Sequence, residues 1–432
     1  LETIHPPFRT YTDPACPTIR RNNVADSIAN TAPTIGENYT WDGHILTGFD
    51  CLPIQNPKMA FSVRRAVIIT GHFPFQKRRG SILWVSDHLQ KMGWHVTFVT
   101  VGYSWLSYLK TDHRLKALEY KPKQGQHIYS NTLTTIFGLS PIHPVKLGYQ
   151  VLDKVLAPFH AFFETYWRSK LRKPLANADL VICESGAPVL LAPMLSEYAA
   201  KAARIYRVND DIRLLNAPDF LLRAEVKNQH HFTRISSANQ GLIEHFGHEN
   251  TTIDPMGIPH LQMKETPVSP YQHTKDTKIA VCAGTTQLDH DALIWVAKNR
   301  PNWQVHVLGR TKGTLSPPKK NLIFHGEVKF DDVLGFIAHA DIGLAPYIDQ
   351  PGIEYQSTNS NRMLLYRHHG LPILGPDRLC DPSLPSMIGY SDPNALDRCE
   401  DTQKRPEVIQ DWLALAIALA QNAEIVPPTD VA

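Results

Sequence analysis

The sequence has no long apolar run and little excess of charge of either sign. Its longest apolar stretch, residues 413–420, is well short of the roughly 18 residues that a membrane-spanning helix needs. With 44 Lys and Arg against 41 Asp and Glu, the 432-residue chain carries a net charge of +3. So small an excess argues against nucleic-acid binding, which draws its affinity from a strongly basic surface. We therefore expect neither a membrane span nor a nucleic-acid partner.

Cysteines are few and widely spaced, and no two of them form a CxxC pair. The six are Cys16, Cys51, Cys183, Cys282, Cys380 and Cys399. This spacing gives no support to a disulfide framework or a zinc site and favours a reducing cytoplasm. The 21 histidines include no HExxH sequence, and neither a Walker A loop nor a GxSxG elbow is present. The sequence thus predicts no metal site and does not favour a hydrolase or a P-loop enzyme.

What the chain does contain is an alternation of short apolar strands and amphipathic helices. A strand at 66–70, a helix at 81–92 and a strand at 95–101 form a βαβ unit, and a similar series starts again at residue 278. The sequence therefore predicts an α/β protein with two Rossmann-like domains. The carboxyl ends of both sheets would face one cleft, where ligands bind.

Changes in composition suggest where these domains begin and end. The first residues are rich in Pro, Asn and Thr without a regular period, and a polar, Pro-rich stretch separates the two βα series. The predicted segments are an extended arm at 1–62, a first Rossmann-like domain at 63–257, a linker at 258–277, a second Rossmann-like domain at 278–400, and a C-terminal helical segment at 401–432 that can return to the first domain.

The segment 158–173 combines five aromatic residues with four basic ones. The aromatics include Phe163 and Trp167 at helical spacing, and the basic residues follow at the C-terminal end. Such a helix either docks on an anionic membrane surface or belongs to the core with a solvated basic end. An acceptor that is anchored in a lipid bilayer would favour the membrane interpretation.

A polar loop, residues 71–80, follows the first strand and leads into a helix. It contains His72, Arg78 and Arg79, which form either a solvated turn or a ligand-binding loop, since a helix N-terminus attracts anions. The loop does not match GxGxxG, so a nicotinamide cofactor loses its main support.

Two adjacent carboxylates, Asp210 and Asp211, follow the strand that ends at Val208. An Asp at this position caps the next helix or, when it faces a cleft, acts as a general base. Spacing alone does not choose between the two residues.

Polar residues also follow three successive strands of the second domain. Glu327 and Tyr347 come after two of them, and the run from Ser357 to Arg362 opens a helix. A carboxylate can accept hydrogen bonds from ribose hydroxyls, and an aromatic ring can cover a base or a sugar. Backbone N–H groups and a fixed cation bind phosphate. Together they suggest a site for a nucleoside-diphosphate sugar.

Collinear motifs extend this interpretation. They are the 72–81 loop, Tyr103-Ser-Trp-Leu-Ser107 with Lys110, Asp112 and Arg114, Glu184-Ser-Gly186, Tyr206-Arg-Val-Asn-Asp210, Gly284-Thr-Thr286 with Asp289, Gly326-Glu327, Ala345-Pro-Tyr347 and Gly370-Leu-Pro372. In order and spacing the chain, over residues 65–376, resembles the inverting GT-B glucuronosyltransferases of glycosyltransferase family 70. These enzymes add glucuronic acid to the lipid-linked oligosaccharide of xanthan-type exopolysaccharide biosynthesis.

The resemblance implies a role for each matching residue. Asp210 falls on the catalytic base, Glu327 and Tyr347 fall on nucleotide-contacting residues, and Arg362 replaces a phosphate-contacting lysine. Thr286 and Asn361 also belong to the donor side, where the family has methionines, and Leu365 replaces a glutamine. The acceptor or cleft side would comprise His72, Arg78, Arg79, Glu184 and Arg207.

The implied activity is transfer of glucuronic acid from UDP-glucuronate to a hydroxyl of a polyprenyl-diphosphate-linked oligosaccharide. The expected enzyme is metal-independent, needs no cofactor and lies on the inner face of the bacterial plasma membrane. Two alternatives remain open at this point. One is a GT-B glycosyltransferase that uses another nucleotide sugar, and the other is a catalytically silent nucleotide-binding subunit of a polysaccharide assembly.

Overall fold

The computed structural model describes most of the chain beyond residue 62. The described residues are 63–76, 79–105, 107, 115, 118, 120–144, 161–215, 217–264, 267–272, 277–311 and 320–421, together with strands β1 (Thr40–Trp41) and β2 (His44–Ile45). The two short strands pair antiparallel and belong to a unit, Leu1–Phe61, that is separate from Ser62–Ala432. The arm predicted at 1–62 lies outside the described residues, apart from those strands.

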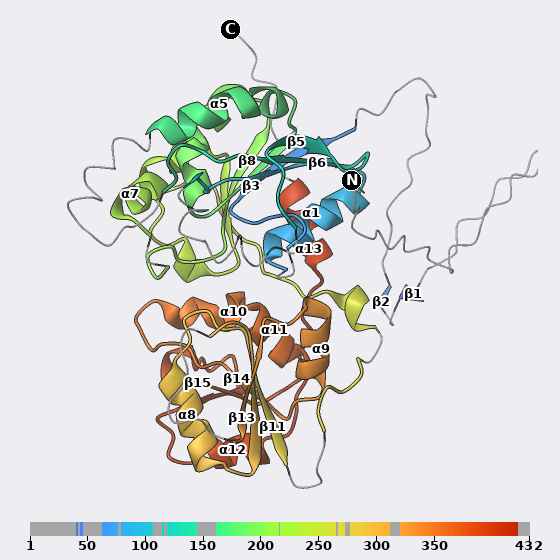
Figure 1. The fold of residues 1–432 in the computed structure, drawn as a ribbon, viewed down its shortest axis with the longest axis vertical. Coiled ribbons are helices and arrows are strands. Elements are labelled where there is room, and N and C mark those ends of the chain that lie inside the picture. Colours follow the sequence, from blue (N-terminus) through green and yellow to red (C-terminus); the bar gives the residue numbers. More distant parts are fainter. Residues whose placement is uncertain are drawn as a thin grey trace, which may run out of the picture. The chain divides into compact units, whose positions relative to one another are not determined.

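The first domain is built on an eight-stranded sheet with the order β10-β9-β8-β7-β3-β4-β6-β5 (Figure 1). Its strands are β3 (Arg65–Thr70), β4 (His95–Thr100), β5 (Gly125–Ile128), β6 (Leu133–Phe137), β7 (Leu180–Glu184), β8 (Ala203–Val208), β9 (Arg234–Ser237) and β10 (Thr251–Ile253). All neighbours pair in parallel except β5, which pairs antiparallel with β6 at one edge. The predicted Rossmann-like α/β architecture is confirmed for this half of the chain.

Helices and short 3-10 turns connect these strands. They are α1 (Ser81–Lys91), α5 (Ala161–Ala176), η2 (Ala187–Leu191), α6 (Ala192–Tyr198), α7 (Asp219–Lys227), η3 (Gln229–His231) and η4 (Gln240–Leu242). The segment between β7 and β8 is not one continuous helix, because a 3-10 turn comes first and α6 ends at Tyr198. Pro193 lies in the first turn of α6, where the N–H that proline lacks is not needed, so the chain starts a new helix there.

Helix α5 turns two of its aromatic residues, Phe163 and Trp167, toward the core. Phe163 and Trp167 are completely buried with Leu171 and Leu175 in the cluster beneath the first sheet. The prediction that these rings dock on a membrane was therefore wrong, because the same helical face packs on the strands. Of the predicted anchor's aromatics in the described part of α5, Phe162 is the exposed one. Residues 158–160 of that predicted anchor lie outside the described residues.

The second domain is built on a six-stranded sheet with the order β13-β12-β11-β14-β15-β16. Its strands are β11 (Lys278–Ala283), β12 (Trp303–Leu308), β13 (Leu322–Gly326), β14 (Ile342–Leu344), β15 (Ile373–Gly375) and β16 (Met387–Gly389), and every pairing is parallel. Its helices and turns are α8 (His290–Asn299), α9 (Phe330–Ala338), η6 (Ile353–Tyr355), α10 (Gln356–Asn359), α11 (Asn361–His368), η7 (Asp377–Leu379) and α12 (Ala395–Asp401). The second βα array is confirmed.

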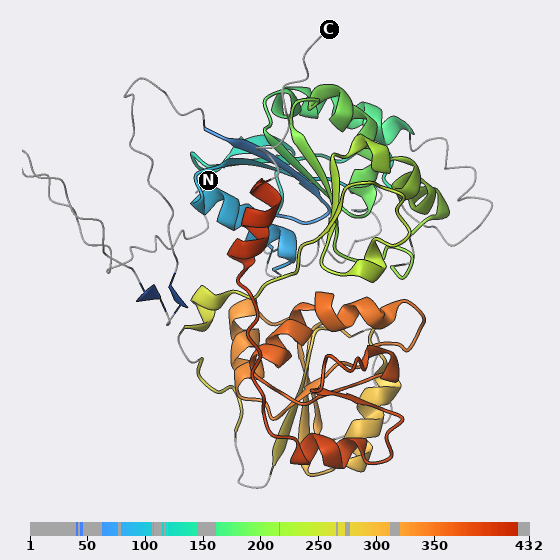
Figure 2. The same cartoon turned by 180° about the vertical axis from the view of Figure 1, so that it is seen from behind.

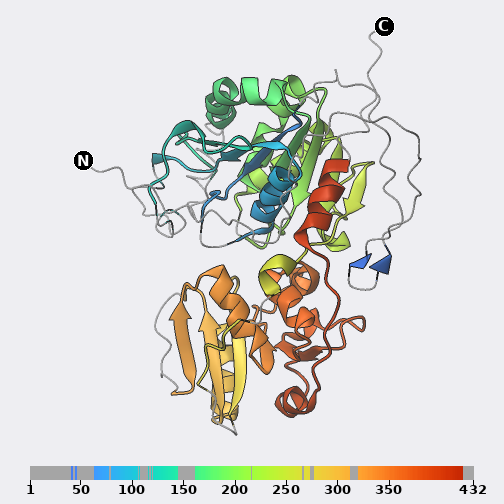
Figure 3. The same cartoon turned by 90° about the vertical axis from the view of Figure 1, so that its right-hand side faces the viewer.

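Two chain segments run between the sheets, side by side in Figure 3. One contains η5 (His260–Met263), and the other leads from the second domain into α13 (Trp412–Gln421). Ile258 and Asp411 form a parallel bridge between the two segments. At Gly257 a Cβ atom would lie 2.5 Å from the Asp411 carbonyl carbon, so this close approach requires glycine.

Helix α13 packs against α1 of the first domain, as Figure 2 shows from behind. Trp412, Leu415 and Leu419 are buried in this contact, and Arg234 of β9 donates to the Ala418 carbonyl oxygen at 3.1 Å. None of the helices in the described part of the chain combines the length and the apolar composition that a bilayer crossing requires.

Candidate active site

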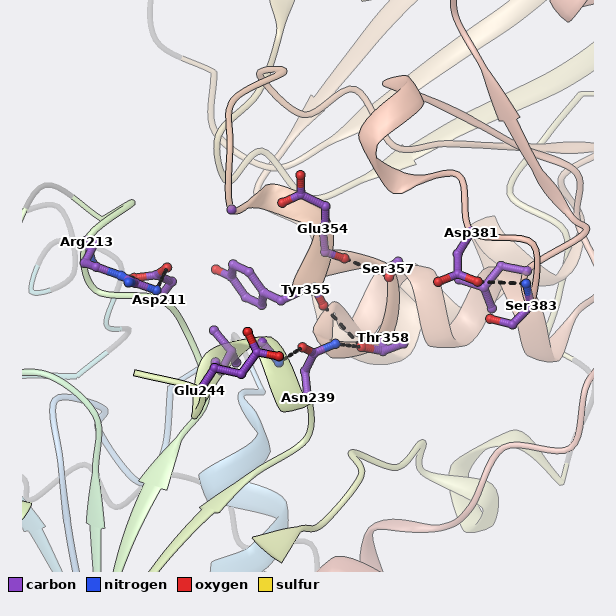
Figure 4. A pocket seen from close by; sticks show the side chains of 14 residues that line it. Asp211, Arg213, Asn239, Glu244, Glu354, Tyr355, Ser357, Thr358, Asp381 and Ser383 are labelled. Carbon is purple, nitrogen blue, oxygen red and sulfur yellow. Dashed lines mark hydrogen bonds and ion pairs between the residues drawn. The ribbon is translucent and has the colours of Figure 1, made fainter. Parts of the chain in front are cut away.

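Loops from both sheets line a pocket of about 360 Å³. Asp211, Arg213 and Asn239 come from loops that follow β8 and β9 of the first domain, while Tyr355 and Thr358 come from η6 and α10 of the second. Figure 4 shows the Tyr355 ring reaching toward the loop that carries Asp211. The carboxyl ends of two parallel sheets thus meet here, where α/β proteins bind their ligands.

Asp210 lies two residues beyond the end of β8 and is partly exposed. Its Oδ1 accepts a hydrogen bond from the Tyr355 hydroxyl at 3.2 Å. Burial raises the pKa of the Asp210 carboxyl above its ordinary value and the nearby Glu184 carboxylate raises it further, whereas the Tyr355 hydroxyl and His72 lower it. A carboxylate with a raised pKa is a stronger base, which suits proton abstraction.

Glu184 ends β7 and is buried beside Asp210. Its Oε1 accepts from Asn209 Nδ2 at 2.7 Å, its Oε2 accepts from the Thr70 hydroxyl, and His72 Nε2 lies 3.7 Å from Oε1. The structure therefore brings His72 and Glu184 together with Asp210.

Arg207 is connected to this group through one intermediate residue, Asn209. It is almost completely buried, and burial lowers its pKa to about 10. Its guanidinium donates to Ser236 Oγ at 2.8 Å, to the Asp254 carbonyl at 2.9 Å and to Asn209 Oδ1 at 3.1 Å. Because Asn209 in turn donates to Glu184, Arg207 orients the carboxylates through Asn209 and makes no direct bond to Asp210 within the described residues.

Arg79 is directed away from this group. Its guanidinium pairs with Asp87 on α1 and lies 4.4 Å from the Trp84 ring centroid. The Arg79 carbonyl accepts from Asn361 Nδ2 at 3.3 Å, so Asn361 reaches the first domain. Arg78 lies outside the described residues.

Asp211 is buried, and the interpretation that an Asp at this position caps the next helix was wrong for this residue. Its Oδ1 accepts from the Arg213 backbone N–H at 2.9 Å, and its Oδ2 pairs with the Arg213 guanidinium at 2.7 Å. Asp211 therefore stabilises the tight turn after Asp210, well before α7 begins.

In the second domain, Arg362 connects the segments that follow two strands, β11 and β14. Its Nη1 donates to the Gly284 carbonyl at 2.9 Å, its Nη2 to the Thr286 carbonyl at 3.4 Å and its Nε to the Tyr347 hydroxyl at 2.9 Å. Tyr347 is buried and donates its own hydroxyl to Gln356 Oε1 at 3.2 Å. Thr286, Tyr347 and Arg362 are thus brought together.

Glu327 follows β13 and pairs with Arg310, which follows β12, at 2.8 Å. Thr285 donates to the Arg310 carbonyl at 2.6 Å, so this ion pair adjoins the loop that carries Thr286. Leu365 is buried in the core and takes no part in the polar site.

Sequence reasoning missed several residues at the boundary between the domains. Tyr355 contacts Asp210, Asn359 Nδ2 donates to the Asn209 carbonyl at 3.1 Å, and Gln287 Nε2 donates to the Leu214 carbonyl at 3.2 Å. Gln287 also has a positive φ of 50°, which strains a residue other than glycine. The polar run after Gly352 was the one available signal, and it does not reveal a contact with a loop far away in sequence.

Two parallel Rossmann-like sheets with a site at their facing strand ends define the GT-B glycosyltransferase class. Solved structures share this fold. One, described as trehalose-6-phosphate from E. coli bound with UDP-2-fluoro glucose, has a TM-score of 0.51 and 9% identity and covers 83% of this chain and 94% of that one. An apo structure of OtsA has a TM-score of 0.52 and 10% identity, with the same coverage.

The sequence comparisons are more specific. Residues 68–238 match the N-terminal domain of glucuronosyltransferase GumK. A curated relative from Xanthomonas campestris pv. campestris, UDP-glucuronate:glycolipid 2-beta-glucuronosyltransferase, is 24% identical over 355 residues, which cover 78% of this chain and 83% of the relative. These comparisons confirm the predicted resemblance to GumK-like glucuronosyltransferases, and the structure has the GT-B fold.

Proposed function

We propose that this protein is an inverting glucuronosyltransferase that moves glucuronic acid from UDP-glucuronate to a hydroxyl of a polyprenyl-diphosphate-linked oligosaccharide. One observation carries the proposal. The partly exposed Asp210 carboxylate lies at the carboxyl end of the first sheet, in contact with the second-domain segment that also carries Arg362. The name of the curated glucuronosyltransferase supplies the donor and the glycolipid class of acceptor.

The reaction is a single displacement at the anomeric carbon. The acceptor oxygen forms a bond to this carbon as the bond to the UDP oxygen breaks, and Asp210 takes the hydroxyl proton. Attack from the face opposite to UDP inverts the configuration. The raised pKa of Asp210 favours this proton transfer at neutral pH.

The second domain would hold the donor. Glu327 would accept hydrogen bonds from the ribose, Tyr347 would line the nucleotide site, and Arg362 with the N-terminus of α11 would bind the diphosphate. Thr286 and Asn361 would lie beside the sugar. In the structure Arg362 already donates to carbonyls and to Tyr347, so it also shapes the loop that receives the phosphates.

The first domain, at the predicted bounds 63–257, would bind the acceptor. His72 and Glu184 lie next to Asp210 and would contact acceptor hydroxyls, while Arg207 acts through Asn209. We assign Arg78 and Arg79 to the same side on the basis of the family resemblance.

The proposed acceptor also implies where in the cell the enzyme would work. A polyprenyl diphosphate keeps its lipid in the bilayer, so the protein would work as a peripheral enzyme at the anionic inner face of the plasma membrane. The four described cysteines are all free, which fits a reducing cytoplasm.

Two alternatives remain testable. Another nucleotide sugar would suit a donor site in which Thr286, Asn361 and Leu365 differ from the family pattern. A silent nucleotide-binding subunit would not need a carboxylate with a raised pKa at Asp210.

A UDP-release assay tests the proposal. The protein is incubated with UDP-glucuronate, UDP-glucose, UDP-galactose and GDP-mannose, each with a lipid-linked oligosaccharide acceptor. Release that depends on acceptor and is fastest with UDP-glucuronate supports the proposal. Release with a neutral sugar alone would identify the first alternative, and UDP binding without any release would identify the second.

A further inference from the structure

We propose that Tyr355, which belongs to the second domain, is a positioning residue for Asp210: its hydroxyl holds one carboxylate oxygen so that the other receives the proton of the acceptor. This inference rests on the proposed function, in which Asp210 is the base. The Tyr355 hydroxyl lies 3.2 Å from Asp210 Oδ1. Within the described residues, no hydrogen bond reaches Oδ2, which leaves that oxygen available.

The Tyr355 ring is set firmly in place. It is 4% exposed and packs in the hydrophobic cluster of the first domain, although the segment that carries it belongs to the second domain. Every other buried residue described in that cluster lies between Val67 and Phe246. A second-domain side chain is therefore inserted into the first domain's core, and such an insertion fixes the ring and its hydroxyl far better than a surface contact would.

The neighbouring residues fasten the same segment to the first domain. Asn359 Nδ2 donates to the carbonyl of Asn209, the residue before the base, at 3.1 Å. Asn239 Nδ2 donates to Thr358 Oγ1 at 2.9 Å. Both bonds hold residues that closely follow Tyr355 against the first domain, so the Tyr355–Asp210 contact is part of a larger interface.

The turn that leads into Tyr355 is also specific. Gly352 has a φ of +90°, which favours glycine, and η6 begins directly after it. A Cβ atom at this position would lie 3.5 Å from Leu214 of the first domain. The left-handed turn thus allows the chain to approach the Asp210 loop closely enough for the ring to insert.

One short segment therefore serves both substrates. Residues 353–362 carry Tyr355, which contacts the base, and Arg362, which shapes the donor loop. The base receives this hydrogen bond only while the two domains are docked in this way, so the orientation of the base depends on the contact between the domains.

Several groups around Asp210 shift the pKa of its carboxyl, and the Tyr355 hydroxyl is one of them. Glu184 on β7, His72 on the loop after β3 and the adjacent Asp211 act on the carboxyl, together with the Tyr355 hydroxyl. Glu184 and Asp211 raise the Asp210 pKa, while His72 and the Tyr355 hydrogen bond lower it. Burial and Asp210 raise the pKa of Tyr355 itself, so its hydroxyl stays protonated and remains a donor.

The test is Tyr355→Phe in the full-length protein, assayed by UDP release with UDP-glucuronate and the lipid-linked acceptor. We expect kcat to fall about tenfold with the KM for UDP-glucuronate within about twofold, because orientation of the base is lost while donor contacts remain. The acid limb of the kcat/KM profile should move to higher pH by on the order of half a unit to one unit, since the ionised carboxylate loses a hydrogen bond.

A second substitution keeps the test independent of folding. Difluorotyrosine incorporated at position 355 retains the ring and the hydroxyl and makes the hydroxyl a stronger donor. It should move the acid limb to lower pH, opposite to the phenylalanine variant. If Tyr355 had only a structural role, the acid limb of the kcat/KM profile would not shift in either variant. Tyr271→Phe is the matched control, because its buried hydroxyl donates at 2.6 Å to the Phe336 carbonyl in the second domain, and its profile should match wild type.

The outcomes separate this inference from the proposed function. A wild-type protein that releases no UDP with any acceptor would overturn the function. The role of Tyr355 alone would be overturned by a different result. In that case the wild type is active and Asp210→Asn is inactive, but the acid limb of the kcat/KM profile does not shift in either position-355 variant. In the Asp210→Asn background, removal of the Tyr355 hydroxyl should have no further effect on turnover.

Discussion

The Arg362 guanidinium lies over the Tyr347 ring, with its Cζ atom 3.9 Å from the ring centroid, and its Nε donates to the Tyr347 hydroxyl at 2.9 Å. Both side chains are buried. The pair joins α11 to the chain after β14, and the same guanidinium reaches the Gly284 carbonyl after β11. A cation held in this way keeps its charge and fixes the segments that follow β11 and β14.

Arg362→Ala should weaken the binding of UDP and of the UDP-sugar together, by about tenfold or more, because a charge-assisted contact and the loop's support are lost. It should also lower the melting temperature, since buried carbonyls lose their donors. Calorimetric titration with UDP measures the affinity. Arg362→Lys keeps the charge but loses the planar guanidinium, so its affinity for UDP should lie between that of the wild type and that of Arg362→Ala. Unchanged affinity in Arg362→Ala would place the diphosphate elsewhere.

Asp210→Asn should lower turnover by roughly 100-fold or more, the usual effect of removing a general base, and should leave UDP affinity almost unchanged. Initial-rate kinetics and UDP titration check the two parts. The matched control is Asp211→Asn, which alters the turn held by Arg213 and should be milder than Asp210→Asn. Near-normal turnover in Asp210→Asn would remove this residue from the mechanism.

Activity should fall toward acid pH as Asp210 becomes protonated, because the protonated carboxyl accepts no proton from the acceptor. Burial raises the pKa of Asp210, so the fall should lie above the ordinary range of an aspartate. The same shift means that ionised Asp210 costs stability once the pH exceeds its pKa. Asp210→Asn should therefore raise the melting temperature more at neutral pH than at acid pH. An acid limb that persists in that variant would belong to another group.

Glu327→Gln should weaken UDP binding with little effect on the melting temperature. The ion pair between Glu327 and Arg310 is partly exposed, and such pairs contribute about 0–1 kcal/mol to folding. Calorimetry with UDP and with dUDP distinguishes a ribose contact, because the loss should be smaller for the analogue if Glu327 accepts from the 2′-hydroxyl. An equal loss of affinity for UDP and dUDP would mean that the effect of Glu327→Gln comes from a contact with the 3′-hydroxyl or from a change in the loop.

Trp167→Ala should destabilise the protein by about 3–5 kcal/mol, because it opens a cavity in the first domain's core. Phe162→Ala, at the 57% exposed position on the same helix, should change stability by about 0.5 kcal/mol or less. Chemical denaturation gives both values. A stable Trp167→Ala variant that fails to bind anionic liposomes would instead restore the membrane interpretation of α5.

Much of the fold followed from local patterns. The strand predicted at 66–70 and the helix predicted at 81–92 agree within one residue with β3 (Arg65–Thr70) and α1 (Ser81–Lys91). The edge strands β5 and β10 were missed, since they are mostly exposed and carry little apolar signal. Helix α5 was predicted as a helix, but its aromatic face was assigned to the wrong environment.

The sequence by itself determined the two βα arrays, the strand-end placement of Asp210, Glu327 and Tyr347, the position of Arg362 at the start of a helix, and the resemblance to glucuronosyltransferases. Hydrophobic period and motif order are local properties, so they can be followed along the chain. Only the tertiary structure decided that Trp167 is buried, that Asp211 belongs to a turn with Arg213, and that Tyr355 reaches Asp210 across 145 positions of sequence. These outcomes depend on which surfaces meet when the two sheets pack, and no local pattern encodes contacts between residues so far apart.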